Sequence, residues 1–164
     1  MSYQEKRTLT IIITMSIVFV AYCLYAFSTY QIQDDIRVWA RIMLIFMGIG
    51  AIATIIIQII FHVLFAVGIA VKEAIHNHEI EESKIGDEIR GAMVEDERDK
   101  LIELKSRQAG FITSGVGFMA ALIVLAIGIL PVVAVNIIFA SFFIGSIVEG
   151  IVNIIFYRRG IVYV

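Results

Sequence analysis

The chain has almost no cysteine, almost no proline and no strong excess of charge of one sign. Of its 164 residues one is Cys and one is Pro, and the formal net charge is -2. A single cysteine excludes an internal disulfide and a zinc site built on cysteines. Without a basic excess, no binding of nucleic acid is expected. What the chain has in quantity is apolar side chains, which make up 60% of the residues.

Charged side chains are absent from three long stretches, residues 8–33, 42–71 and 108–148. About 20 apolar residues are enough for a helix to cross a bilayer. The third stretch has room for two helices, and Pro131 marks the turn between them. The sequence therefore predicts an all-α, polytopic protein of the bacterial or archaeal cytoplasmic membrane, with the lipid bilayer as its partner. Its four transmembrane helices are expected over roughly residues 9–27, 38–71, 109–130 and 132–157.

Basic residues near the ends of these helices gather on one side of the membrane if the helices alternate in direction. They are Lys6, Arg7, Lys72, Lys100, Lys105, Arg107, Arg158 and Arg159. Such a bias predicts that both termini and residues 73–107 are cytoplasmic. The chain then divides into a first transmembrane hairpin (1–72), a charged and partly helical cytoplasmic segment (73–107) and a second transmembrane hairpin (108–164).

The second and fourth apolar helices share a sequence pattern. The stretch GAIATIIIQIIFH from Gly50 aligns with GSIVEGIVNIIFY from Gly145 at a constant offset, which also pairs Gln58 with Asn153. This pattern indicates an internal duplication. The two hairpins would then have the same orientation and form a parallel repeat about an axis along the membrane normal.

Glu149 interrupts the last apolar run. Because residues four apart share a helix face, it lies on a polar stripe with Asn153 and Tyr157. The matching stripe on the second helix contains Thr54, Gln58 and His62. A carboxylate is costly in hydrocarbon, so this face should turn inward. Three interpretations are open: helix packing through small and amide side chains, a polar pathway or ion site centred on Glu149, or a position of Glu149 near the inner headgroups.

The third helix carries small residues at spacings that allow close helix contact, Gly110 with Ser114 and Thr113 with Gly117. Thr113 and Ser114 are also candidates to complete a polar cluster with Glu149. The depth of His62 is open. Counting from Lys72 makes it level with Glu149, whereas the repeat makes it level with Tyr157.

Residues 72–107 contain eleven acidic and seven basic side chains. Within them His76, His78 and Glu79 form a weak candidate metal site, and a solvated linker is the favoured interpretation, so we predict neither a metal nor a cofactor. Downstream, Asp96, Asp99 and Glu103 share a helix face, which indicates a solvated carboxylate face rather than a cation site. Acid-before-base pairs four residues apart favour a charged helix that runs straight into the third span.

The stretch EDERDKLIELKSRQAG, which ends at Gly110, resembles a block found in small uncharacterised bacterial membrane proteins with four predicted spans. In that group a DERD-x-LIEL motif leads directly into the third helix. The resemblance covers residues 94–110 and implies the four-span layout and a bacterial inner-membrane location. It implies no catalytic residue.

Two functions remain as hypotheses. The first is a homo-oligomeric transporter or ion pathway, with a dimer favoured, lined by the polar stripe around Glu149. The alternative is a structural or regulatory membrane module whose charged segment docks a cytoplasmic protein partner. An enzyme is not expected, because the sequence offers no acid–base–nucleophile set.

Overall fold

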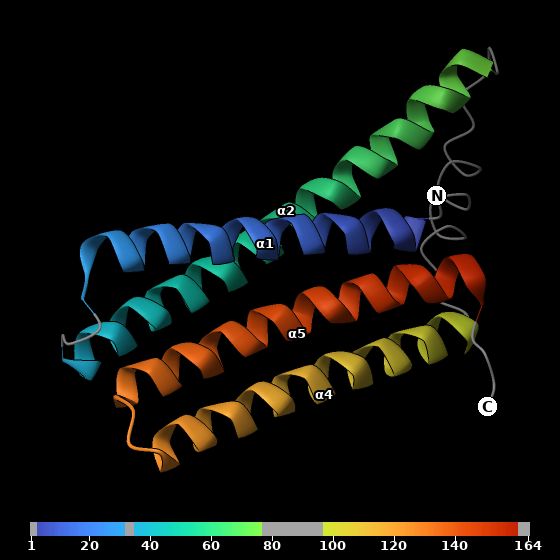
Figure 1. The fold of residues 1–164 in the computed structure, drawn as a ribbon. Coiled ribbons are helices and arrows are strands. Elements are labelled where there is room, and N and C mark those ends of the chain that lie inside the picture. Colours follow the sequence, from blue (N-terminus) through green and yellow to red (C-terminus); the bar gives the residue numbers. More distant parts are fainter. Residues whose placement is uncertain (1–2, 32–34, 77–96, 161–164) are drawn as a thin grey trace.

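The computed structural model describes residues 3–31, 35–76 and 97–160 (Figure 1). Within this part of the chain nearly every residue is helical and no strand occurs. The helices are α1 (Tyr3–Thr29), α2 (Ile36–His76), α4 (Glu97–Ala126) and α5 (Pro131–Arg159). All four are long and apolar enough to cross a membrane, α2 over Ile36–Gly68. The prediction of an all-α chain with four helices able to span a membrane is therefore confirmed.

Two of the helices begin earlier than the apolar runs alone indicate. α4 is continuous from Glu97 into its apolar part, as the pattern of acidic and basic residues predicts, and Glu103 pairs with Arg107 one turn later at 2.5 Å. α1 begins at Tyr3 rather than near residue 9. Its first turn is held by other helices, because Glu5 is paired with Arg158 of α5 at 3.3 Å and Tyr3 packs on α2.

The connection between α4 and α5 differs slightly from expectation. α4 ends at Ala126 and the chain turns through Gly128, whose φ of +81° suits a glycine. Pro131 is then the first residue of α5, where its missing N–H has no helical partner to lose. The turn thus comes before the proline, and the proline starts the helix.

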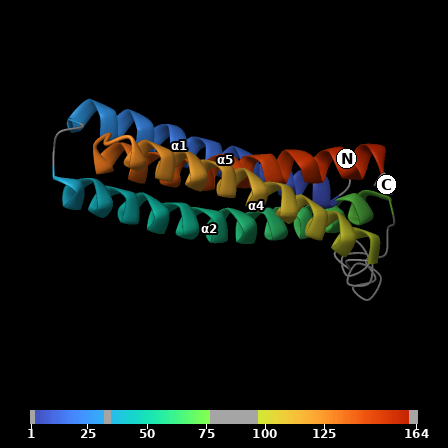
Figure 2. The ribbon, with the colours of Figure 1, turned by 60° about the horizontal axis from the view of Figure 1, so that its bottom comes forward.

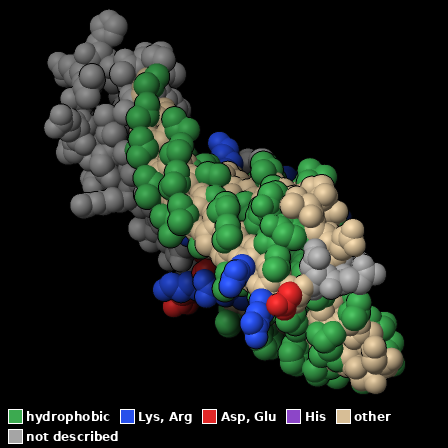
Figure 3. All heavy atoms as spheres, turned by 90° about the vertical axis from the view of Figure 1, so that its left-hand side faces the viewer, with side chains coloured by type: hydrophobic (Ala, Val, Ile, Leu, Met, Phe, Trp, Pro, Cys, Tyr) green, Lys and Arg blue, Asp and Glu red, His purple; other side chains and the backbone are tan. Residues whose placement is uncertain are grey.

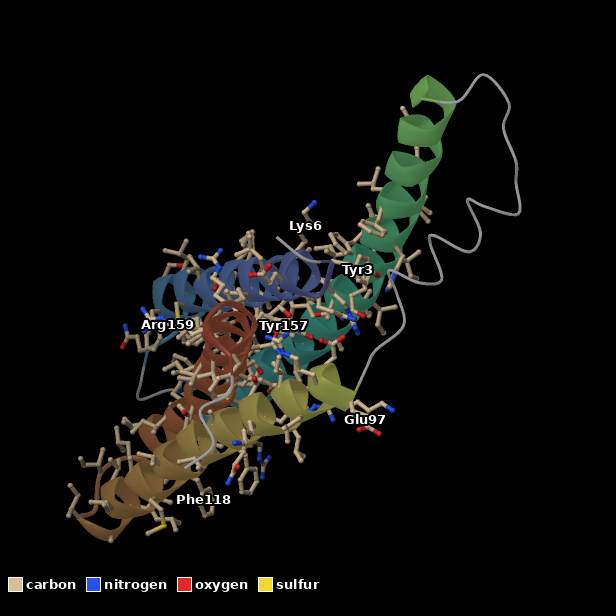
Figure 4. All side chains as sticks on the ribbon, turned by 90° about the vertical axis from the view of Figure 1, so that its right-hand side faces the viewer. Tyr3, Lys6, Glu97, Phe118, Tyr157 and Arg159 are labelled. Atoms are coloured by element: carbon tan, nitrogen blue, oxygen red, sulfur yellow. The ribbon has the colours of Figure 1, made fainter. Side chains whose placement is uncertain are left out.

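The four helices alternate in direction, so that the starts of α1 and α4 and the ends of α2 and α5 share one end of the molecule (Figure 1). We call this the terminal end; Figure 4 looks at it and labels Tyr3, Glu97, Tyr157 and Arg159 there. The opposite, loop end carries the α1–α2 and α4–α5 connections. α5 is central, packing most extensively on α4 and then on α1, whereas α2 packs mainly on α1.

A core of large side chains closes the bundle toward the loop end. Tyr22 of α1, Trp39 of α2 and Phe139 of α5 are among its buried residues. The Trp39 indole donates a hydrogen bond to the Gln31 carbonyl oxygen at 3.2 Å. Seen from the loop end, most of the remaining surface is hydrophobic and the charges form a few small groups (Figure 3). A surface of this kind suits a hydrocarbon environment.

α2 is the most exposed and the longest helix. Its 41 residues correspond to about 60 Å at the α-helical rise, whereas the hydrocarbon core of a bilayer is about 30 Å thick. It lies beside α1, which it contacts from Trp39 to Phe65, and it packs much less on α5 (Figure 2). Its last turns project beyond the other helices (Figures 1 and 4). The helix is therefore longer than the hydrocarbon core requires, and its last turns form this projection.

Candidate functional site

A polar chamber of about 200 Å³ lies between α1, α4 and α5 at the terminal end. Glu149 of α5 is one of its lining residues, and none of the lining comes from α2. The lining residues are Gln4, Arg7, Thr8, Ile11, Met15, Asp99, Glu103, Ser146, Glu149, Gly150, Asn153 and Tyr157.

The α1 wall of the chamber follows from helical periodicity. Gln4, Thr8, Ile11 and Met15 recur at spacings of four, three and four residues, which places them on one face. This face is polar at the terminal end and becomes apolar with depth. The Thr8 hydroxyl donates a hydrogen bond to the side-chain oxygen of Asn153 at 3.0 Å. That bond fixes the Asn153 amide against α1.

Close contact between α4 and α5 determines where Glu149 lies. A Cβ atom added to Gly110 would be 2.9 Å from the Gly145 carbonyl oxygen and 3.0 Å from Glu149 Cβ. A Cβ atom on Gly145 would overlap Ser114 Oγ and lie 2.8 Å from the Gly110 carbonyl oxygen. The two glycines therefore let the backbones meet, and Glu149 occupies the space that Gly110 leaves free.

The Glu149 carboxylate faces protein and the chamber rather than lipid. Its side chain is half-buried, and no side chain in the described part of the chain hydrogen-bonds to it. Two charges of α4 act on it: Arg107 attracts the carboxylate and Glu103 repels it. A carboxylate held in this way keeps its acceptor positions for water or for a bound cation.

Charges at the terminal end are sorted by sign. Among the residues whose side chains the structure describes there, the exposed charges other than Glu97 are basic: Lys6, Arg98, Lys100, Arg107, Arg158 and Arg159. The covered ones are mostly acidic: Glu5, Asp99, Glu103 and Glu149, together with Arg7 and Lys105. Three carboxylates and one guanidinium line the chamber, and Arg107 pairs with one of these carboxylates, Glu103. One negative charge remains in excess, which attracts positive charge.

The structure brings together only some of the residues that the sequence singles out. Glu149, Asn153 and Tyr157 line the chamber together. By contrast, the hydroxyls of Thr54, Thr113 and Ser114 donate to carbonyl oxygens four residues earlier in their own helices. Gln58 lies on α2, away from the chamber lining. The predicted polar cluster around Glu149 is thus replaced by groups from α1.

His62 lies in a separate aromatic cluster. Its imidazole is hydrogen-bonded to the Tyr3 hydroxyl, and Phe61 and Phe65 pack on the same tyrosine ring. This contact puts His62 at the terminal end, where Tyr157 also lies (Figure 4). The position agrees with the depth estimated from the repeat and excludes a direct pair with Glu149.

The weak candidate metal site at His76, His78 and Glu79 falls outside the part of the chain whose side chains the structure describes. Among the residues that the structure describes, no three His, Cys, Asp or Glu side chains are grouped to hold a metal ion. His78, Glu79 and Asp96 lie outside the described residues, as does the side chain of His76. Asp99 and Glu103 share the predicted face, and this face lines the chamber.

Sequence reasoning did not identify Gln4, Arg7, Thr8 or Ser146 as site residues. A signal was present for α1, because Gln4 and Thr8 continue the periodicity of Ile11 and Met15 toward the terminal end. No pattern within a single helix, however, reveals which other helix it faces.

Comparison with known proteins yields no match: no family model, curated protein or solved structure is similar to this chain. The resemblance of residues 94–110 to a group of bacterial four-span proteins therefore stays a prediction.

Proposed function

We propose that the chain is a small, non-enzymatic transporter or ion pathway in which Glu149 binds the transported cation. The observation that carries this proposal is the state of the Glu149 carboxylate. It borders a chamber at the terminal end, and no side chain among the described residues hydrogen-bonds to it. A site for a transported ion needs such an accessible group.

The interpretation that Glu149 serves only to pack helices is less favoured, because other residues provide the contact between α4 and α5. Gly110, Ser114 and Gly145 already provide the close contact between α4 and α5. Asn153, the amide nearest along the stripe, is bonded to Thr8 instead of Glu149. If Glu149 served only to join helices, a described donor would be expected within hydrogen-bonding distance of its oxygens.

The charge of the lining supports a cation over an anion. Asp99, Glu103 and Glu149 line it together with Arg7, and with the Arg107 partner of Glu103 included the acidic groups are still in excess by one. The exposed basic residues around the chamber suit the phosphates of lipid headgroups, which leaves the acidic interior for the substrate. A volume of about 200 Å³ holds a hydrated inorganic cation or a small organic one.

The positive-inside rule indicates the side of the membrane to which the chamber opens. The terminal end carries the excess of lysine and arginine, so we propose that it is cytoplasmic, with both termini on that side of a bacterial or archaeal cytoplasmic membrane. The chamber then opens toward the cytoplasm. The parallel repeat remains part of the proposal. It is supported by Gly50 and Gly145, which each face the other helix of their own hairpin, at Val18 and at Gly110.

We propose a homodimer as the assembly. Gln58 is only half-covered on α2, a helix with little other protein around it. An amide that faces hydrocarbon without a partner is unfavourable, and a second copy of the chain can supply one.

The alternative, a regulatory module that docks a cytoplasmic protein, is favoured by one feature. α4 is a continuous helix from Glu97, so a partner bound to its charged start would move Glu103 and Gly110 with it. Most of the charged segment 73–107 lies outside the described residues, and its docking role stays a prediction.

A flux assay tests the proposal. Purified protein is placed in phosphatidylethanolamine–phosphatidylglycerol vesicles under an inside-negative potential, and the entry of protons, sodium and methylammonium is followed. We expect entry of at least one of them, reduced about tenfold or more by Glu149→Gln. Glu97→Gln, which changes an exposed carboxylate outside the chamber, should leave the rate unchanged. Entry of none, or equal loss in both variants, would contradict the proposal.

A further inference from the structure

Beyond the chamber, the seam between α1 and α5 contains a second polar pair. The Tyr22 hydroxyl of α1 donates a hydrogen bond to the side-chain oxygen of Asn136 on α5 at 2.7 Å. Both residues border a groove of about 310 Å³ near the loop end, lined otherwise by apolar side chains such as Phe19 and Val132. The same two helices thus border the chamber toward the terminal end and this groove toward the loop end.

Between these two spaces the seam is filled by aromatic rings. Phe19 of α1 and Phe143 of α5 stack with ring centroids 5.3 Å apart and an interplanar angle of 23°. Phe139 continues the contact, 5.0 Å from the Phe143 ring and 4.4 Å from the Tyr22 ring. Phe143 is 9% exposed and Tyr22 is 2% exposed, whereas Phe19 is half-buried and borders the groove.

Helical spacing gives the order of the groups along the seam. On α1, Met15 borders the chamber, Phe19 follows one turn later and Tyr22 one turn after that. On α5 the order toward the loop end is Ser146, Phe143 and then Asn136. From Ser146 to Asn136 the rise is about 15 Å, and the aromatic layer lies between the two.

We propose that the substrate route of the transporter runs along the α1–α5 seam, and that Phe19 and Phe143 form the constriction separating the Glu149 chamber from the Tyr22–Asn136 pair. This inference rests on the proposed function. Apolar rings that meet across a narrow passage exclude water and so stop hydrated ions. The constriction determines which cation passes: a proton or a small cation that sheds its water is admitted when the rings part, and a bulky cation is refused.

The test compares two neighbouring phenylalanines of α5. Phe143 belongs to the stack, whereas Phe142 is 60% exposed on another face of the same helix. In the vesicle assay, Phe143→Ala should raise the entry of protons and of tetramethylammonium about tenfold or more over the unaltered protein. Phe142→Ala should have no such effect. Equal rates for the two variants, while Glu149-dependent flux persists, would overturn the constriction and leave the proposed function standing.

A second variant separates a widened route from a damaged protein. If Phe143 closes the route that starts at Glu149, the added proton flux of Phe143→Ala should fall again in Phe143→Ala/Glu149→Gln. A leak caused by misfolding would not depend on Glu149, and such a result would contradict the inference. Absence of flux in the unaltered protein and in every variant would contradict both the constriction and the proposed function.

Discussion

The Thr8 hydroxyl of α1 and the side-chain oxygen of Asn153 in α5 are joined by a hydrogen bond of 3.0 Å. This bond links the first hairpin to the second at the wall of the chamber. It lies along the seam between the Glu5–Arg158 ion pair and Glu149, so two polar contacts align α1 with α5 before the apolar part of the seam begins.

Removing this hydrogen bond should weaken the contact between the hairpins. Thr8→Val keeps the shape of the side chain but cannot donate, and we expect a loss of about 1 kcal/mol in the free energy of unfolding. Thr10→Val is the matched control, because the Thr10 hydroxyl bonds only to the Lys6 carbonyl oxygen of its own helix. Unfolding in mixed micelles measures both. Equal losses for the two variants would show that the Thr8–Asn153 bond contributes nothing specific.

A second prediction concerns the effect on stability of replacing a glycine at the α4–α5 contact. Gly145→Ala would bring a Cβ atom onto Ser114 Oγ and the Gly110 carbonyl oxygen, and it should cost about 1–3 kcal/mol in unfolding free energy because the backbones must separate. Gly115→Ala is the control, since nothing lies within 4 Å of its added Cβ. Alanine is the better helix former, so that variant should be neutral or slightly more stable. Destabilisation by Gly115→Ala instead of Gly145→Ala would contradict the packing described for this helix pair.

Orientation in the membrane is a third prediction. In a Cys23→Ser background, a new cysteine at Gln33 should react with an impermeant thiol reagent added outside cells, because it falls on the side with few basic residues. A cysteine at Ser83 should react only after the membrane is opened. Reaction at Ser83 in intact cells would reverse the proposed orientation, and the chamber would then open outward.

Much of the fold could be predicted because charge and proline mark the ends of membrane helices. Three stretches without charge gave four spans, and Pro131 located the last connection within a few residues. The pairing of helices could not be predicted in the same way. In lipid, apolar surfaces gain nothing by meeting one another, so an isoleucine-rich helix such as α2 contains little information about its neighbour.

For the candidate site, too, the residues on one helix could be predicted and the contacts between helices could not. Glu149, Asn153 and Tyr157 follow one stripe on one helix, and periodicity was enough to place them together. Thr8 comes from the other hairpin, and its part in the site depends on tertiary contact. Small residues were the informative exception, since Gly110 and Ser114 were expected at a close helix contact and do lie against Gly145.

The proposed pathway requires above all that water reaches Glu149 from the chamber. In a Cys23→Ser background, Glu149→Cys can be compared with Ile151→Cys two residues later, where the native side chain is 47% exposed and apolar. Vesicles of known orientation are treated with a membrane-impermeant thiol reagent, and labelling is followed over time. We expect rapid labelling at position 149 from the side that carries Tyr3 and Arg159, and much slower labelling at position 151, which faces hydrocarbon. Equal slow rates at both positions, or labelling at 149 only from the opposite side, would contradict the proposed pathway.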